Sequence, residues 1–367
     1  MDVIYLDFEK AFDRINHDML LRKLSFFGFC RSSLSFVSSY LRGREQFVRY
    51  RGHDSPFFPA FSGVPQGSRL GPLLFLLAIN DIVQCVRGVE ILLFADDVKI
   101  FRAIDSLEDC AALQDTLDAI AEWAASNLFR VNVDKSFCMS FYRRHTVIPS
   151  TYLFRDAPFP SVLSVNDLGV LFDRRLTFAD HIDGVVSKGF RCLNFLLRCT
   201  LSLSCADTYL LLYNALVRPH LEYCSPLWAP TRKKSMGRVE SVQDRFVRML
   251  FYRLNGFYPS FPNQISYRLL IENLSLDSLK ARRSRARLLF VYKILNNFVD
   301  DSGLLSLFRL RVPLAHLRRR DGEFFYKGAF LSGSSVGQMM ELFNAHPSLD
   351  LGVSFRVFCD LLSDLPL

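Results

Sequence analysis

Two adjacent aspartates, Asp96 and Asp97, interrupt the apolar stretch ILLFADDVKIF at residues 91–101. The apolar runs on both sides of the pair predict a β-hairpin with the carboxylates at its tip. An ordinary turn is one interpretation, because Asp is common in turns. Two features argue against it: no Gly or Asn follows to form a favoured two-residue turn, and neighbouring carboxylates repel each other. A divalent cation would relieve this repulsion, since Mg²⁺ binds one or two carboxylates together with substrate phosphates.

A further carboxylate, Asp7, lies in YLDFEKAFD, after an expected strand and before an expected helix. Asp7 or Asp13 could simply cap that helix. The chemical interpretation requires Asp7 to lie beside the Asp96 hairpin in one sheet. Two metal ions held by carboxylates stabilise the attacking and leaving oxygens in phosphoryl transfer, and a carboxylate from a separate strand is what such a site needs.

A loop rich in Gly and Pro, SGVPQGSRLGP, covers residues 62–72. Its glycines, Gly63, Gly67 and Gly71, would allow the backbone to approach a ligand closely. Gln66 adds a neutral amide that can donate and accept hydrogen bonds. A loop of this composition is more often only a connection between elements.

The elements that must position these residues change in character along the chain. Strand patterns cover 3–8, 91–101, 129–141 and 162–172, with a strand pair over 46–50 and 57–61; helical patterns cover 10–27, 32–41, 73–86 and 107–128. After about residue 180, helical patterns dominate, over 181–199, 206–218, 235–252 and 277–297. This order predicts a mixed α+β domain followed by a mostly helical region.

The composition indicates a globular protein with a polyanionic partner. Half of the 367 residues are hydrophobic, 35 are Phe, and the net charge is +8. Such a charge suits nucleic acid or an anionic membrane surface, but no apolar run reaches the ~18 residues of a membrane span. The nine cysteines form no CxxC pair, which favours reduced thiols and an intracellular location, nuclear or cytoplasmic.

Basic residues are concentrated between Arg232 and Arg287, a segment that contains 13 Lys and Arg but only 4 Asp and Glu. Arg282, Arg283, Arg285 and Arg287 lie close together on an expected helix. Binding that follows a nucleic-acid backbone needs such charge. The alternative is a solvated helix face.

In this order, the three motifs resemble those of a known family. YLDFEKAFD is similar to polymerase motif A, SGVPQGSRLGPLLF to motif B and FADDV to motif C. NVDKS at 132–136 resembles motif D, and VNDLGVLFDRRLTFADHI at 165–182 resembles the primer-grip region. Further segments at 213–230 and 238–250 resemble those that follow the polymerase core in insect elements. Over about residues 1–290, the sequence resembles the reverse transcriptase of a non-LTR (LINE-type, jockey-like) retrotransposon.

The resemblance implies a fold and a set of domains. The fold would be α+β, with a right-hand polymerase palm made of an antiparallel sheet with helices on one face. The palm with partial fingers would cover 1–180, a helical thumb and connection-like region 181–300, and a C-terminal region 301–367. The resemblance also implies two Mg²⁺ ions (or Mn²⁺), an RNA template, a DNA primer and dNTPs; neither a membrane nor a specific protein partner is expected.

The resemblance also assigns roles to single residues. Asp7 and Asp96 would bind metal, with the Phe8 carbonyl near the second ion and Asp97 as the third acidic residue. The other implied positions are Phe12 as steric gate or core aromatic, Gln66 and Gly67 beside the incoming nucleotide, Lys135 near the triphosphate, and Leu168 and Gly169 at the primer end.

The sequence also departs from the family pattern. Motif A begins at residue 2, so an N-terminally truncated copy is expected, without the finger segments, endonuclease domain or CCHC knuckle. Positioning contributes much of phosphoryl-transfer catalysis, so impaired activity is expected from this chain. A catalytically inactive remnant that only binds nucleic acid is the alternative. An RNA-directed RNA polymerase is a third, against which Phe12 and the segments after the palm argue.

Overall fold

The computed structural model describes residues 1–142, 148–201, 203, 205–259, 265–311, 323–326 and 333–365. The chain divides into two compact units, residues 1–177 and 178–367, which are described separately. Residues 301–367, expected to form a region of their own, are part of the second unit.

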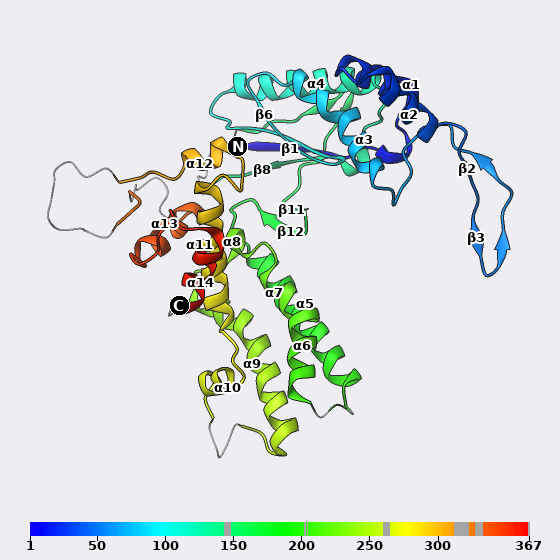
Figure 1. The fold of residues 1–367 in the computed structure, drawn as a ribbon. Coiled ribbons are helices and arrows are strands. Elements are labelled where there is room, and N and C mark those ends of the chain that lie inside the picture. Colours follow the sequence, from blue (N-terminus) through cyan, green and yellow to red (C-terminus); the bar gives the residue numbers. More distant parts are fainter. Residues whose placement is uncertain are drawn as a thin grey trace. The chain divides into compact units, whose positions relative to one another are not determined.

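The first unit contains a four-stranded antiparallel sheet with strand order β6-β7-β1-β8 (Figure 1). Its strands are β1 (Asp2–Leu6), β6 (Glu90–Phe94), β7 (Asp97–Arg102) and β8 (Phe137–Ser140). In the central strand, Ile4 pairs with Ile100 on one side and with Cys138 on the other. The predicted hairpin around the two aspartates is present, since β6 and β7 pair up to Phe94 and Asp97.

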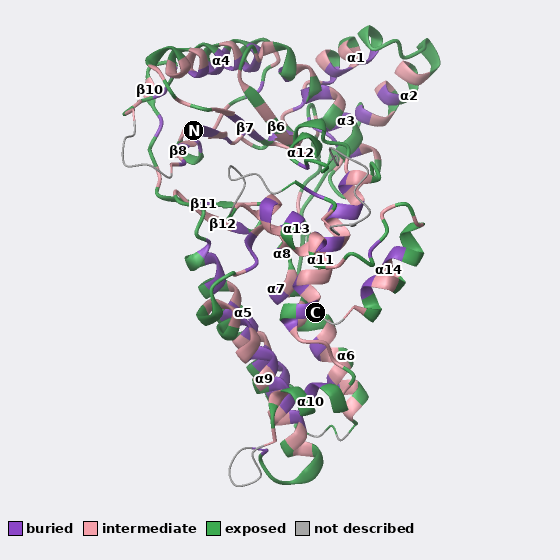
Figure 2. Ribbon diagram, turned by 90° about the vertical axis from the view of Figure 1, so that its left-hand side faces the viewer, coloured by how far each residue is buried: buried purple, intermediate pink, exposed green. Residues whose placement is uncertain are grey.

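Successive side chains of a strand point to opposite faces of the sheet. Apolar side chains gather on one face of this sheet, and helices cover that face. Ile4, Val98 and Ile100 are at most 1% exposed and belong to the main core. Figure 2 shows buried residues along the strands and on α4. The helices of this unit are α1 (His17–Phe26), α2 (Arg31–Leu41), α3 (Leu70–Ile79) and α4 (Leu107–Ser126). The predicted α+β fold with an antiparallel sheet and helices on one face is confirmed.

A hairpin of β11 (Ser164–Asp167) and β12 (Val170–Asp173) belongs to a second apolar cluster, in which Val165 packs with Val3 and Met139. The expectation of one strand over 162–172 is therefore wrong. Leu168 and Gly169 have φ of 45° and 83° and form a two-residue turn. Gly favours this left-handed backbone, and such turns match the twist of a hairpin.

The remaining strands of the first unit are short. The expected pairing of 46–50 with 57–61 is confirmed only where β2 pairs with β5. The second half of the first segment, β3, pairs instead with β4 at residues 53–54. These strands are β2 (Glu45–Gln46), β3 (Arg49–Tyr50), β4 (His53–Asp54) and β5 (Phe58–Pro59), and a further pair is β9 (Leu153–Phe154) with β10 (Ala157–Pro158).

The helix expected over 10–27 is interrupted. A 3₁₀ turn covers Ala11–Asp13, and α1 begins only after Asn16, whose side chain accepts a hydrogen bond from the Met19 amide at 2.9 Å. Asn favours this N-cap position over a helix interior because its side chain competes for backbone hydrogen bonds. Two further 3₁₀ segments are Asn80–Cys85, which follows α3, and Val133–Lys135.

The second unit is mostly helical, as predicted. Its helices are α5 (Ala179–Cys199), α6 (Ala206–Leu216), α7 (Arg218–Glu222), α8 (Ser225–Trp228), α9 (Lys233–Asn255), α10 (Tyr267–Asn273), α11 (Leu279–Leu295), α12 (Ser302–Ser306), α13 (Ser335–Asn344) and α14 (Phe355–Asp364). The Tyr213 and Phe246 rings stack at 4.1 Å between α6 and α9. Among the described helices, none has the length and apolar character needed to cross a membrane.

Candidate active site

The pairing of β1 with β7 brings two of the candidate carboxylates to one end of the sheet. Leu6 pairs with Val98, so the next position of this register places Asp7 opposite Asp97. Residues opposite each other on neighbouring strands project to the same face. The Asp7 backbone is held by two hydrogen bonds: its carbonyl accepts from the Asn132 amide at 2.7 Å, and its amide donates to Ser136 Oγ at 3.2 Å.

The three acidic side chains interact electrostatically. Partial burial raises the pKa of the Asp7 carboxyl, Lys135 opposes this effect, and Asp96 adds to it. Partial burial and then repulsion from Asp96 raise the pKa of Asp97. Lys135 Nζ lies 3.9 Å from Asp7 Oδ2. The site therefore concentrates negative charge, which Lys135 beside Asp7 and Lys99 near Asp97 oppose only in part.

A pocket of about 200 Å³ collects several of the predicted residues. Asp7, Asp97, Lys135 and Leu168 line it together with Asp167. Asp96 lies instead in the turn between β6 and β7, after Ala95, whose φ is 52°. A positive φ is costly for alanine and is typical of strained turns, so the hairpin closes tightly even without Gly or Asn.

The oxygen donors of this site fit Mg²⁺. Across the described segments, no group of three or more Asp, Glu, His or Cys side chains is arranged to hold a metal ion. Mg²⁺ does not need such a cage, because it usually takes one or two carboxylates and completes its shell with water and phosphates. Partial burial and then repulsion between the carboxylates raise the pKa of Asp7 and Asp97, and a bound cation would relieve the repulsion.

The Phe8 side chain has a structural role, which leaves its carbonyl as the candidate ligand. The side chain is 2% exposed and packs against Trp123 and Phe129. Its backbone faces Val131, but the flanking hydrogen bonds use the Asp7 carbonyl and the Glu9 amide. The Phe8 carbonyl is therefore not used in that pairing, and its proximity to a metal ion stays a prediction.

Hydrogen bonds join the turn after β1 to the loop at 62–72. The Val64 amide donates to the Phe12 carbonyl at 2.9 Å, and Gln66 Nε2 donates to Asp13 Oδ1 at 2.9 Å. Gly63 has φ of 76°, and a Cβ there would lie 2.6 Å from the Asp13 backbone. Only Gly can occupy such a position without displacing the neighbouring chain.

The glycines of this loop differ in what surrounds them. Gly63 and Gly71 approach the protein's own backbone, since a Cβ at Gly71 would lie 2.7 Å from the Pro65 carbonyl oxygen. The expectation that all three glycines admit a ligand is therefore wrong for these two. Gly67 has φ of 75° and nothing within 4 Å of a Cβ, so a role for Gly67 beside a nucleotide stays a prediction.

Phe12 packs in the core. Its ring stacks on Phe75 at 4.3 Å with an interplanar angle of 18°, and the side chain is partly buried. The structural role is thus observed, whereas the role as a steric gate stays a prediction.

Three of the four arginines on α11 have acidic partners within the second unit. Arg282 forms an ion pair with Glu222 through two guanidinium nitrogens, and Arg285 forms one with Asp277. Both arginines are partly buried, and their contact with nucleic acid stays a prediction.

Arg283 and Arg287 also serve the interior of the second unit. Arg283 is 4% exposed, and its guanidinium lies 3.9 Å from Glu240. Arg287 Nη2 donates to the Ala229 carbonyl at 3.0 Å, and burial lowers the pKa of Arg287 to about 10. A side chain as buried as Arg283 cannot reach a phosphate, so the nucleic-acid role predicted for Arg283 is wrong in this structure.

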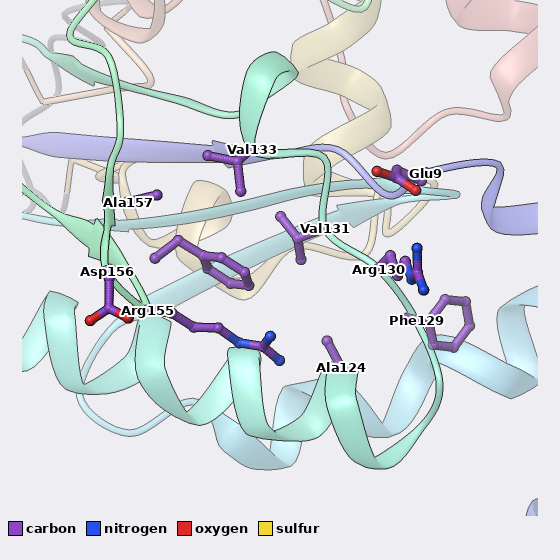
Figure 3. A pocket seen from close by; sticks show the side chains of 10 residues that line it. Glu9, Ala124, Phe129, Arg130, Val131, Val133, Arg155, Asp156 and Ala157 are labelled. Atoms are coloured by element: carbon purple, nitrogen blue, oxygen red, sulfur yellow. The ribbon is translucent and has the colours of Figure 1, made fainter.

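A second pocket, of about 640 Å³, lies near the end of α4 (Figure 3). Arg155 and Asp156 lie at one end of it, and Glu9 and Arg130 at the other. None of the predicted site residues lines this pocket. We therefore assign the candidate site to the smaller pocket, which holds the carboxylates.

Comparison with known proteins shows which family this part of the chain belongs to. Residues 3–172 match the family model described as "Reverse transcriptase (RNA-dependent DNA polymerase)". Residues 3–172 belong to the reverse transcriptase family. This match covers every predicted residue of the first unit, from Asp7 to Gly169.

Relatives of the reverse transcriptase domain come from mobile elements. The chain is 31% identical over 265 residues to a probable RNA-directed DNA polymerase from transposon X-element of Drosophila melanogaster. It is 29% identical over 260 residues to the RNA-directed DNA polymerase from mobile element jockey of the same species. Each alignment covers 67% of this chain and 28% of the relative, so the chain spans a little over a quarter of the relatives' length. The domain is of the non-LTR retrotransposon type.

A solved structure is less similar to this chain than these relatives are. A telomerase from Candida tropicalis, in complex with a fragment of telomeric RNA, aligns with 100% of this chain and 49% of its own length. The sequence identity is 12% and the TM-score 0.39, too low to support a fold assignment.

Proposed function

We propose that this chain is an RNA-directed DNA polymerase that adds deoxynucleotides to a primer 3′-hydroxyl by a two-metal mechanism. The observation that carries the proposal is the grouping of Asp7, Asp97 and Lys135 around one pocket of a reverse transcriptase domain. The reaction joins the primer 3′-oxygen to the α-phosphorus of the nucleotide and releases pyrophosphate.

The residues of the pocket would divide the work. Asp7 and Asp96, with the Phe8 carbonyl near the second ion and Asp97 as the third acidic residue, would hold divalent cations. Mg²⁺ bound by these residues would supply positive charge that stabilises the attacking and leaving oxygens. Lys135 has a side chain that is 71% exposed, close to Asp7, which leaves its ammonium free to donate to nucleotide phosphates.

Three other residues would border the nucleotide. Phe12 lies in the turn that follows Asp7, and a partly exposed ring there can exclude a ribose 2′-hydroxyl. Gln66 and Gly67 lie in the loop that is hydrogen-bonded to this turn. Leu168 and Gly169, at the tip of the β11–β12 hairpin, would contact the primer end.

Primer extension tests the proposal. The chain is mixed with an RNA template, a DNA primer, Mg²⁺ and either dNTPs or rNTPs, and incorporation is followed over time. Wild type should incorporate dNTPs in preference to rNTPs, and Asp96→Asn should reduce incorporation at least 100-fold, as removal of a transition-state stabiliser does. Asp115→Asn, an exposed carboxylate on α4, is the matched control and should retain activity.

Each outcome decides between the alternatives. Incorporation that is undiminished in Asp96→Asn would show that the site is wrong. Salt-sensitive binding of the template–primer without incorporation would favour the inactive remnant. Faster incorporation of rNTPs would favour an RNA polymerase.

A further inference from the structure

One ion pair joins the sheet to the β11–β12 hairpin beside the candidate site. Lys99 Nζ donates to Asp167 Oδ1, and the two side chains are only 12% and 15% exposed. Lys99 lies in β7, two residues after Asp97, and Asp167 is the last residue of β11. Both line the pocket that also contains Asp7 and Asp97. Neither residue was a candidate from the sequence.

The sheet holds the lysine in one place. Lys99 pairs with Tyr5 in the register of β1 and β7, and its ammonium lies over the Tyr5 ring at 5.9 Å from the ring centre. The Tyr5 ring in turn stacks on Phe137 of β8 at 5.0 Å. A cation above an aromatic face is attracted by the ring, so Tyr5, itself stacked on Phe137, supports the lysine from the neighbouring strand β1.

The hairpin is attached at both ends. Near its base, Phe172 meets Phe141 edge-on at 6.5 Å, and Val165 belongs to the apolar cluster with Val3. At its tip, the ion pair ends at Asp167, and the Leu168–Gly169 turn follows directly. The apolar contacts fix where the hairpin lies on the sheet, and the ion pair fixes how its tip stands relative to the carboxylates.

Stability alone does not explain a pair of this kind. Removing two charges from water costs several kcal/mol per ion, and apolar replacements of buried pairs are often neutral or stabilising. A charge-assisted hydrogen bond is short and directional, so it sets a geometry better than an apolar contact does. The geometry set here is the distance from the hairpin tip to Asp7 and Asp97.

We propose that Lys99 and Asp167 are positioning residues, which hold the tip of the β11–β12 hairpin so that a primer 3′ end is presented to Asp7 and Asp97. This inference rests on the proposed polymerase function and deepens it. The ligand is the recessed 3′ end of a DNA strand paired with RNA. The pair acts through the turn and does not itself contact the reacting atoms.

Binding to two RNA–DNA hybrids tests the proposal. One hybrid has a recessed DNA 3′ end, and in the other a loop joins that end to the RNA. Fluorescence anisotropy gives the dissociation constant of the full chain for each hybrid, and their ratio measures the preference for an end. Wild type should prefer the recessed end. The apolar double variant Lys99→Met with Asp167→Leu should lose about tenfold of that preference, the middle of the range for coupled residues in contact.

Controls separate positioning from folding. The melting temperature of the double variant should stay within a few degrees of wild type or rise. Exchanging the charges, with Lys99→Asp and Asp167→Lys together, should restore part of the preference. Arg49→Met breaks an exposed ion pair with Asp54 in the same unit and should leave the preference unchanged.

Two results would overturn the proposal separately from the function. If wild type prefers the recessed end and the apolar variant keeps that preference, or loses affinity for both hybrids equally, the pair is only structural. If wild type shows no preference for an end, the primer role of the hairpin is contradicted, whereas the polymerase function is decided separately by the primer-extension assay.

Discussion

Replacing Gly63 by alanine should destabilise the first unit far more than the same change at Gly67. Both glycines have nearly the same φ, 76° and 75°, and an alanine in this region costs about 1–2 kcal/mol. At Gly63 the new methyl group would also lie 2.6 Å from the Asp13 backbone, whereas at Gly67 nothing lies within 4 Å. Overpacking typically costs about 1–3 kcal/mol. We therefore expect losses of roughly 2–5 kcal/mol for Gly63→Ala and about 1–2 kcal/mol for Gly67→Ala.

Urea unfolding measures this difference. The sequence has two tryptophans, and Trp123 lies on α4, 9% exposed in the core of the first unit. In a Trp228→Phe background, Trp123 fluorescence reports on that unit alone. A difference of ~2 kcal/mol moves the midpoint by about 1 M urea at a slope of about 2 kcal/mol per M. Equal losses in the two variants, or a smaller loss for Gly63→Ala, would refute the argument from the close approach to Asp13.

Two further predictions concern the second unit. Glu240→Ala should lower the free energy of unfolding of this unit by about 3 kcal/mol, because Arg283 would be left buried without its carboxylate partner. Urea unfolding, followed by Trp228 fluorescence in a Trp123→Phe background, measures this loss. An unchanged midpoint would contradict the ion pair of Arg283 with Glu240 in the interior. Burial lowers the pKa of His181 below its ordinary 6.5, so the unfolded chain binds a proton more readily than the folded one. Stability should be unaffected by this group above about pH 7.5 and fall as the pH drops through 6.5, and melting temperatures should show a weaker fall in His181→Gln.

The sequence predicts well those features that depend on local pattern. The alternation of strands and helices before residue 180, the hairpin at FADDV and the helices after 180 are all present. Asp7 follows its strand, as expected, because the apolar run that precedes it is short and continuous. The positions of Asp7 and Asp96 could be predicted because one follows a strand and the other lies in a turn, and both features are visible in the local sequence.

Features that depend on partners far along the chain could not be predicted. Arg283 appears as surface charge until the fold places Glu240 beside it. The ion pair of Lys99 with Asp167 joins residues 68 positions apart. The sequence patterns of their two strands do not indicate that either charged side chain is largely buried. Gly63 appeared suited to a ligand, but the space around it is filled by the Asp13 backbone.

One local signal was available and missed. Asn16 precedes the first turn of α1 and caps it, so the expected helix over 10–27 could have been divided there. A helix interior rarely favours Asn, whereas the N-cap position does. Likewise, Gly169 within an apolar run marked the turn between β11 and β12.

Counting the bound divalent ions tests the central claim most directly. Mn²⁺ binding is followed by electron paramagnetic resonance with the chain, a template–primer whose DNA lacks a 3′-hydroxyl, and a dNTP. We predict two Mn²⁺ ions per wild-type chain, fewer in Asp7→Asn, and two in the control Asp115→Asn. Equal binding by wild type and Asp7→Asn would contradict the assignment of Asp7 and its neighbours as the metal site of a polymerase.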